Sequence, residues 1–220
     1  GNGEALIRDV VTLIDPSIRY TSSRTVAVIT TPMFDVIERT NSDSYNLYAE
    51  ALFKRIGHEV TSDPGSWDNG SSVIRMLLAE KLGAGAAETT VIEDGSGMCR
   101  ENKVSPETLV KWMRVLSRSD HWEMFSDSLA VPGKGTLRNR FKGDTIQSEL
   151  RAKSGYLTGT YALTGVLEHP KSGQRVAFSI MLNNVKSGAT SRNAKPLVDS
   201  LVEGIDEWMS QRAGSPAMGG

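Results

Sequence analysis

Two short motifs hold side chains that could transfer protons and bind a peptide. Lys153, Ser154 and Gly155 are consecutive in a strand-forming run, which brings an ammonium, a hydroxyl and a glycine onto one sheet edge. Ser44 and Asn46 lie at a predicted loop-to-helix junction, where the simplest interpretation of the serine is a helix N-cap. The functional alternative is a hydroxyl that relays a proton beside an amide that binds a carbonyl. Capping and catalysis are compatible, because a helix start holds side chains rigidly.

Helical periodicity dominates the first two thirds of the chain, and strand patterns dominate the last third. Helices are predicted over residues 4–14, 32–39, 45–56, 71–82, 105–116, 120–129 and 193–209. Strands are predicted over residues 24–30, in the run around Lys153, and over residues 161–168 and 175–183, with turns at Gly159 and over 169–174. This order predicts an α+β fold, an α/β sandwich in which helices pack on the faces of an antiparallel sheet.

Three local details are predicted from the same patterns. Gly57 is expected to end the helix over 45–56 in a left-handed cap. Residues 61–70 have the composition of a loop, with Ser71 or Ser72 capping the next helix. In the last helix, Leu197, Leu201, Ile205 and Trp208 form one apolar stripe with Val198 and Val202 beside it, and this helix is expected to cover one face of the sheet.

The composition is that of an ordinary globular domain. Hydrophobic residues make up 39% of the 220 positions, which predicts one sizeable domain over residues 1–210 and a disordered tail over 211–220. The net charge of -1 gives no footprint for nucleic acid, and no run approaches the ~20 apolar residues of a membrane span. A single cysteine, Cys99, and three scattered histidines predict neither a disulfide nor a metal site, and no cofactor is expected.

Four motifs occur in a fixed order along the chain. They are residues 44–50 (SYNLYAE), 94–97 (DGSG), 135–141 (GTLRNRF) and 152–159 (AKSGYLTG). In this order the chain resembles the D-alanyl-D-alanine carboxypeptidase/endopeptidase family, the class C low-molecular-mass penicillin-binding proteins. The resemblance covers residues 26–209 and implies a β-lactamase/transpeptidase-like fold.

The chain departs from the family pattern at the nucleophile. The family's acylating serine lies in an upstream Ser-x-x-Lys motif, and no lysine of this chain has a serine three residues before it. In the family that motif precedes an inserted pair of small domains, so this chain is expected to begin after them and to lack the N-terminal part of the domain. The alternative is a natural homologue that has lost its nucleophile. In either case this chain alone is not expected to hydrolyse a peptide bond.

The resemblance implies catalytic roles for three residues in acyl transfer through an acyl-enzyme. Ser44 would pass a proton to the leaving amine, and Asn46 would hold the substrate's backbone. Lys153 would supply positive charge near Ser44 and near the substrate's terminal carboxylate. The nucleophile itself and its partner lysine would come from the missing segment.

Substrate binding is assigned by the resemblance to the strand that follows Lys153. Ser154, which replaces the family's usual threonine, would donate a hydrogen bond to the terminal carboxylate, and Gly155 would let the strand approach the substrate closely. The backbone N–H of Tyr156 would form one half of the oxyanion hole. The implied substrates are peptidoglycan stem peptides, the implied inhibitors are β-lactams, and the implied location is the periplasm or another extracytoplasmic part of the cell envelope.

The motifs leave three hypotheses open. The leading one is the C-terminal part of a serine-type D-Ala-D-Ala carboxypeptidase/endopeptidase. The second is a catalytically inactive homologue that binds peptidoglycan or a partner protein. The third is a truncated piece that folds poorly or associates with itself, because a missing segment would leave a sheet edge and apolar surface exposed.

Overall fold

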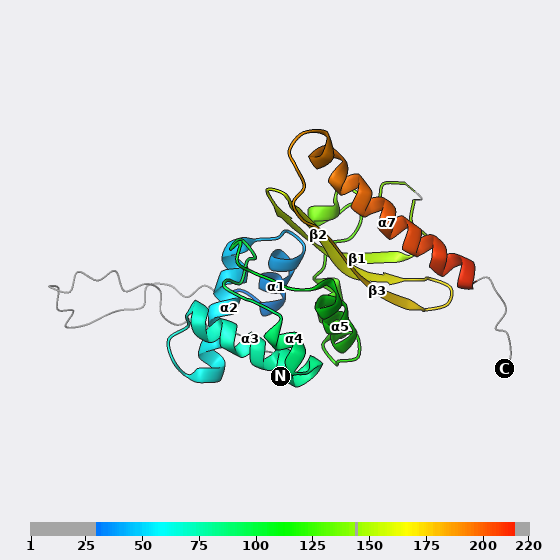
Figure 1. Cartoon of the computed structure of the whole chain (residues 1–220). Coiled ribbons are helices and arrows are strands. Elements are labelled where there is room, and N and C mark those ends of the chain that lie inside the picture. The colour runs from blue at the N-terminus through cyan, green and yellow to red at the C-terminus, as the bar shows by residue number, and fades with distance from the viewer. Residues whose placement is uncertain (1–29, 144, 214–220) are drawn as a thin grey trace, which may run out of the picture.

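The computed structural model describes residues 30–143 and 145–213, which form a group of helices beside a three-stranded antiparallel sheet (Figure 1). The helices are α1 (Met33–Asn41), α2 (Asn46–Thr61), α3 (Trp67–Leu82), α4 (Ala84–Glu88), α5 (Pro106–Leu116), α6 (Trp122–Asp127), the 3-10 helix η1 (Gly135–Leu137) and α7 (Ala189–Ala213). The strands are β1 (Glu149–Leu157), β2 (Thr160–Glu168) and β3 (Arg175–Leu182). The α+β prediction is confirmed. The predicted helix over 4–14 lies outside the described residues, as does the predicted strand over 24–30 except for its last residue.

The sheet has the order β1-β2-β3 with antiparallel neighbours. A two-residue turn at Thr158 and Gly159 joins β1 to β2, and the φ angle of +84° at Gly159 is one that glycine adopts without strain. The predicted turn is therefore confirmed. In this register Lys153 pairs with Thr164. Because side chains alternate along a strand, Lys153 and its neighbour Ser154 lie on opposite faces of the sheet.

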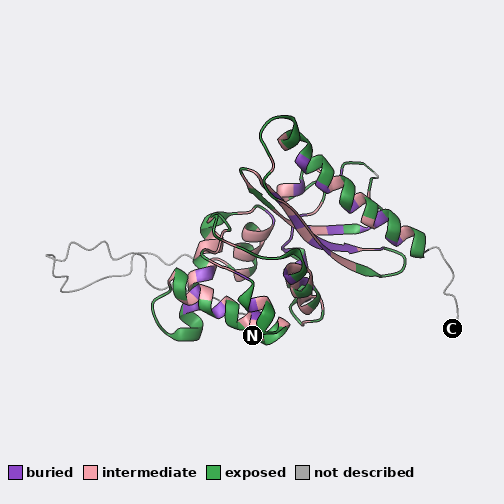
Figure 2. Cartoon of the chain, viewed as in Figure 1, coloured by how far each residue is buried: buried purple, intermediate pink, exposed green. Residues whose placement is uncertain are grey.

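Each face of the sheet has its own apolar core. On the first face, side chains of all three strands pack against α7; the buried members include Leu150, Ala152, Leu163, Leu167, Phe178, Val198, Val202 and Met209. On the second face, Met113 of α5 and Leu129 pack against Val166 of β2, with Trp122 and Phe125 of α6 beside them. Figure 2 shows the buried residues running along the strands between these helices. The sheet is therefore a layer between α7 and the α5–α6 pair.

The face of α7 that packs on the sheet is centred on the residues beside the predicted stripe, and Ile205 of that stripe also packs against the core. Val198, Val202 and Met209 are buried, whereas Leu197 and Trp208 of the predicted stripe are 50% and 44% exposed. The α7 helix runs to Ala213, past the predicted start of the tail at 211, and the remainder of that tail lies outside the described residues. Among the described residues no helix is long and apolar enough to cross a membrane.

One buried carboxylate helps to fix the rotation of α7. Asp206 is 3% exposed and accepts hydrogen bonds from the backbone N–H groups of Gln147 (2.7 Å) and Ser148 (2.9 Å), just before β1. A buried carboxylate needs such donors, so turning α7 to bury Leu197 would leave Asp206 without them. The observed rotation therefore satisfies both the apolar core and this polar group.

The predicted boundary between α2 and α3 is wrong at both ends. The α2 helix continues through Gly57 to Thr61, and Ser62 takes the left-handed cap with a φ angle of +63°. Gly57 is buried where α2 crosses α3, and a Cβ there would lie 2.2 Å from the Asn69 side-chain oxygen. The α3 helix begins at Trp67 with a capping box between Ser66 and Asn69, six residues into the predicted loop. Gly57 therefore allows a close helix crossing and does not end a helix.

Candidate active site

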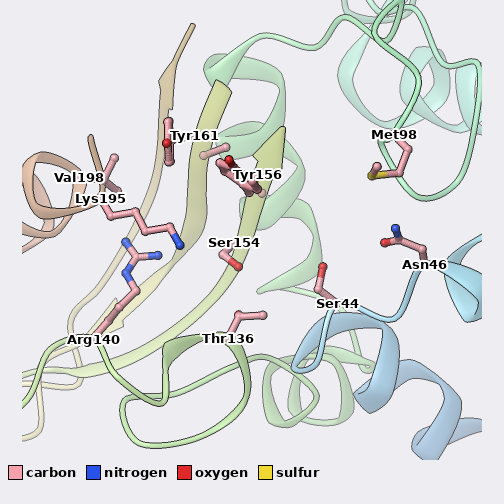
Figure 3. A pocket seen from close by; sticks show the side chains of 12 residues that line it. Ser44, Asn46, Met98, Thr136, Arg140, Ser154, Tyr156, Tyr161, Lys195 and Val198 are labelled. Carbon is pink, nitrogen blue, oxygen red and sulfur yellow. The ribbon is translucent and has the colours of Figure 1, made fainter. Parts of the chain in front are cut away.

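A pocket of about 380 Å³ lies between the start of α2, the end of β1 and α7 (Figure 3). Five of the six predicted site residues line it, namely Ser44, Asn46, Ser154, Gly155 and Tyr156. The sixth, Lys153, lies on the face of β1 opposite to Ser154 and reaches the pocket wall through its contact with Ser44. The fold thus brings together two motifs that are 109 residues apart in the sequence.

Ser44 lies in the turn that connects α1 to α2. Its φ angle of +60° is uncommon for a residue with a side chain and costs about 1–2 kcal/mol. The N-cap of α2 is Tyr45, which makes no side-chain capping bond, so the interpretation of Ser44 as the N-cap is wrong. Asn46 is the first residue of α2. The strained turn therefore directs the Ser44 hydroxyl to Lys153 and not to the helix end.

Lys153 forms two short hydrogen bonds through its ammonium group. Its Nζ donates to Ser44 Oγ and to the backbone oxygen of Ser154, each at 2.7 Å. Burial lowers the pKa of Lys153 to about 8, from an ordinary value of 10.5. At neutral pH the amine is therefore charged but can release a proton far more readily than an exposed lysine, which suits proton exchange with Ser44.

Within residues 30–143 and 145–213, the outer edge of β1 is paired only in its first half. Ala152 exchanges two backbone hydrogen bonds with Ala130, at 3.1 and 2.9 Å, on the side away from β2. Because backbone groups alternate in direction along an antiparallel strand, Ser154 and Tyr156 direct theirs to the same outer edge. The Ser154 carbonyl receives the Lys153 ammonium there. The Tyr156 N–H faces the open part of the edge, where a ligand oxygen could accept a hydrogen bond.

A loop held by Glu50 forms the wall above α2. The Glu50 carboxylate accepts hydrogen bonds from the backbone N–H groups of Gly95 (3.3 Å) and Ser96 (3.0 Å) and from the Trp67 indole (2.9 Å). Partial burial alone would raise the pKa of Glu50, but the donors on Ser96, Trp67 and Gly95 outweigh it and keep the pKa below its usual value. Glu50 lies one turn after Asn46, so a single helix orients both this loop and the Asn46 amide.

The predicted turn at residues 94–97 is confirmed as a structural turn. Asp94 accepts hydrogen bonds from Gly97 N (2.7 Å), Cys99 N (2.6 Å) and Asn102 Nδ2 (2.8 Å). These three donors satisfy the hydrogen-bonding capacity of its carboxylate inside the loop. The loop in turn carries Met98, 52% exposed, into the lining of the pocket.

The loop before β1 is docked on the turn that contains Ser44. Gly135 has a φ angle of +58°, and a Cβ there would lie 2.3 Å from Ser42 Oγ. The Thr136 N–H donates to the Ser42 carbonyl at 2.9 Å. This close approach places Thr136 in the pocket lining and sets the start of the segment that leads to Arg140.

Arg140 and Lys195 line the pocket and were not predicted as site residues. Arg140 lies inside the motif over residues 135–141, so its sequence context is a usable signal. Lys195 has no such signal, because the sequence does not say which of two adjacent apolar stripes of α7 meets the sheet. Asp199, also on α7, accepts the Nε of Arg140 at 2.9 Å together with one of its terminal nitrogens.

Two relatives of this chain are named D-alanyl-D-alanine carboxypeptidases. The chain is 36% identical over 151 residues to the D-alanyl-D-alanine carboxypeptidase of Actinomadura sp. (strain R39), a match that covers 66% of this chain and 27% of that protein. It is 26% identical over 172 residues to D-alanyl-D-alanine carboxypeptidase DacB of Haemophilus influenzae, covering 76% of this chain and 35% of the relative. The chain therefore spans about a quarter to a third of the length of these relatives.

Solved structures show the same fold at lower identity. Penicillin-binding protein 4 (dacB) from Haemophilus influenzae, in complex with a β-lactam, superposes with a TM-score of 0.70 at 22% identity, covering 86% of this chain and 44% of that one. The profile of the D-Ala-D-Ala carboxypeptidase 3 (S13) family matches residues 7–204. This chain belongs to the D-Ala-D-Ala carboxypeptidase 3 (S13) family.

Proposed function

We propose that this chain supplies one wall of a serine-type D-Ala-D-Ala carboxypeptidase/endopeptidase site that acts on peptidoglycan stem peptides through an acyl-enzyme. The observation that carries the proposal is the 2.7 Å hydrogen bond from Lys153 Nζ to Ser44 Oγ, which joins two family motifs beside one pocket. Residues 1–210 are proposed to form the C-terminal part of a transpeptidase-like domain. The proposed location is extracytoplasmic, where peptidoglycan lies.

Four of the predicted residues have defined roles in this proposal. Ser44, coupled to Lys153, passes a proton to the leaving amine, and the pKa of about 8 at Lys153 suits that transfer near neutral pH. Asn46 binds the peptide backbone. The Tyr156 N–H, on the open edge of β1, donates to the developing oxyanion, and removing one such donor typically costs about 3–4 kcal/mol of barrier.

The acylating serine is proposed to come from outside these 220 residues, because no Ser-x-x-Lys sequence occurs among them. β-Lactams are the proposed covalent inhibitors of the complete site, since the penicillin-binding relative was solved with a β-lactam bound. The same missing motif favours one alternative, a catalytically inactive homologue that binds peptidoglycan or a partner protein. The free edge of β1 is the proposed surface for any self-association.

A fluorescent penicillin separates these possibilities. Incubated with this chain alone, it is expected to leave no covalent label after denaturing electrophoresis, and a stable label would refute the assignment of the nucleophile to another segment. In a protein that contains this chain together with a Ser-x-x-Lys segment, labelling is expected, and Lys153→Ala should strongly reduce it. Retained labelling in that variant would contradict the role of Lys153. No labelling of the longer protein would favour the inactive binding homologue.

A further inference from the structure

Trp67 is a large aromatic side chain that the proposed acyl transfer does not use. It is the first residue of α3, and 51% of its surface is exposed. Its indole N–H donates to the Glu50 carboxylate at 2.9 Å, and the Lys54 ammonium lies 3.5 Å from the centroid of its ring. The ring is thus held at one edge and over one face, and half of it still meets solvent. A side chain fixed in this way loses little conformational entropy when a ligand packs on it.

The Glu50 carboxylate ties Trp67 to the wall of the pocket. Glu50 also accepts the backbone N–H groups of Gly95 and Ser96, in the loop that continues into the pocket lining. Together with the indole, these donors use most of the acceptor capacity of the carboxylate. Glu50 therefore positions the ring, and the groups left for a ligand are the ring itself and the Lys54 ammonium.

Asn46, Glu50 and Lys54 lie on successive turns of α2 and share one side of the helix. Asn46 lines the pocket, and Lys54 lies about 12 Å further along the helix axis. An extended peptide spans that distance with about three or four residues. A peptide with its C-terminus at Ser154 and its backbone on Asn46 that continues along α2 therefore brings its N-terminal end to Trp67.

The group that peptidoglycan carries at the N-terminal end of a stem peptide is an N-acetylated sugar. One face of a pyranose ring consists of C–H bonds and packs on an aromatic ring, whereas its hydroxyl and N-acetyl oxygens need polar partners. The Trp67 indole supplies the apolar platform, and the Lys54 ammonium, with three N–H donors, can donate to the sugar oxygens beside it. This pair suits a sugar better than a purely apolar ligand, which would desolvate the ammonium without a partner.

We propose that Trp67 and Lys54 form a sugar-binding subsite that takes the N-acetylated hexosamine at the N-terminal end of a stem peptide. The inference rests on the proposed function and adds a specificity to it, because stem peptides attached to glycan are bound in preference to free peptides. Glu50 serves both parts of this surface, since one carboxylate holds the pocket loop and the indole.

The test is an NMR titration of the 15N-labelled 220-residue chain with an N-acetylmuramyl pentapeptide ending in D-Ala-D-Ala and with the same peptide carrying an acetyl group in place of the sugar. Wild type is expected to bind the sugar-bearing peptide about tenfold more tightly, through the added aromatic contact. Trp67→Ala should lose this preference and keep its affinity for the sugar-free peptide. Trp208→Ala, the matched control, removes a tryptophan that is 44% exposed near the C-terminal end of α7, away from α2 and α3 (Figure 1), and should bind as wild type does.

Trp67→Phe separates stacking from a merely structural role. Phenylalanine keeps an aromatic face but lacks the N–H that donates to Glu50. Most of the preference for the sugar should therefore remain in this variant. A loss as complete as in Trp67→Ala would assign the effect to the Glu50 contact and overturn the subsite, and so would an unchanged preference in Trp67→Ala.

Tetra-N-acetylchitotetraose, a glycan without a peptide, separates the subsite from the proposed function. Its binding should shift the Trp67 indole resonance saturably, and Trp67→Phe identifies that resonance among those of the four tryptophans. If the glycan binds in this way and the sugar-free peptide does not bind, the subsite stands and the proposed function is rejected. If both peptides bind with equal affinity, the subsite is rejected and the proposed function stands. Absence of all binding rejects both.

Discussion

Burial of the Lys153 ammonium should make the stability of this chain depend on pH in a way that one substitution can isolate. The pKa of Lys153 is about 8 in the folded chain, compared with an ordinary value of 10.5. The unfolded chain therefore binds this proton more tightly, and the charged lysine opposes folding by about 3 kcal/mol at pH 7. That penalty is fully present below pH 8 and shrinks as the pH rises towards 10.5.

Lys153→Met removes the titrating group and keeps a side chain of similar length. Linkage between the two pKa values predicts that the free energy of unfolding of wild type rises by about 1.4 kcal/mol relative to that of Lys153→Met between pH 7 and pH 9. The comparison cancels every other group that titrates in this range. Urea unfolding followed by circular dichroism at pH 7, 8 and 9 measures the difference, with equal m-values as the condition for comparing the free energies of unfolding.

Lys171→Met is the control for this experiment, because Lys171 is exposed in the turn between β2 and β3. Its difference from wild type should stay constant from pH 7 to pH 9. A constant difference for Lys153→Met as well would refute the burial argument and remove the support for Lys153 as a proton-transfer group. If the free energy of unfolding of wild type instead fell relative to that of Lys153→Met between pH 7 and pH 9, the folded site would stabilise the charged form.

Two further substitutions test the elements that position the pocket. Gly57→Ala is expected to destabilise the chain by about 1–3 kcal/mol in urea unfolding, because its Cβ would overlap α3. Gly85→Ala, where a Cβ meets nothing within 4 Å, is the control, and equal losses in both variants would contradict the close-crossing argument. Glu50→Gln is expected to speed amide hydrogen exchange in the loop over 93–97 about tenfold, through the loss of charge-assisted bonds. Exchange as slow as in the exposed-site control Glu80→Gln would show that Glu50 does not hold the loop.

Local chemistry explains what could be predicted about this fold. The β-branched and apolar runs on either side of Gly159 predict the β1–β2 hairpin, because only glycine takes the required φ angle at low cost. Ser105 and Pro106 likewise mark the start of α5, where the Ser105 hydroxyl accepts the Thr108 N–H at 3.0 Å. Signals of this kind depend on a few adjacent residues and survive any tertiary arrangement.

Contacts between distant segments explain what could not be predicted. Glycine is common at the ends of helices, but the role of Gly57 depends on Asn69 of the crossing helix. The rotation of α7 is decided by Val198, Val202 and the buried Asp206, although Leu197 and Trp208 make an equally apolar stripe in the sequence. A helical pattern with two adjacent apolar stripes does not say which one meets the sheet.

The sequence by itself determined the motifs, their order and the family, because these depend on residue types and spacing alone. The tertiary structure decided how the charges are used. Sheet alternation placed Lys153 against Ser44 and put Ser154 into the pocket lining. The rotation of α7 brought Lys195 beside Arg140. These pairings join residues many positions apart, so they exist only once the core has fixed the elements relative to one another.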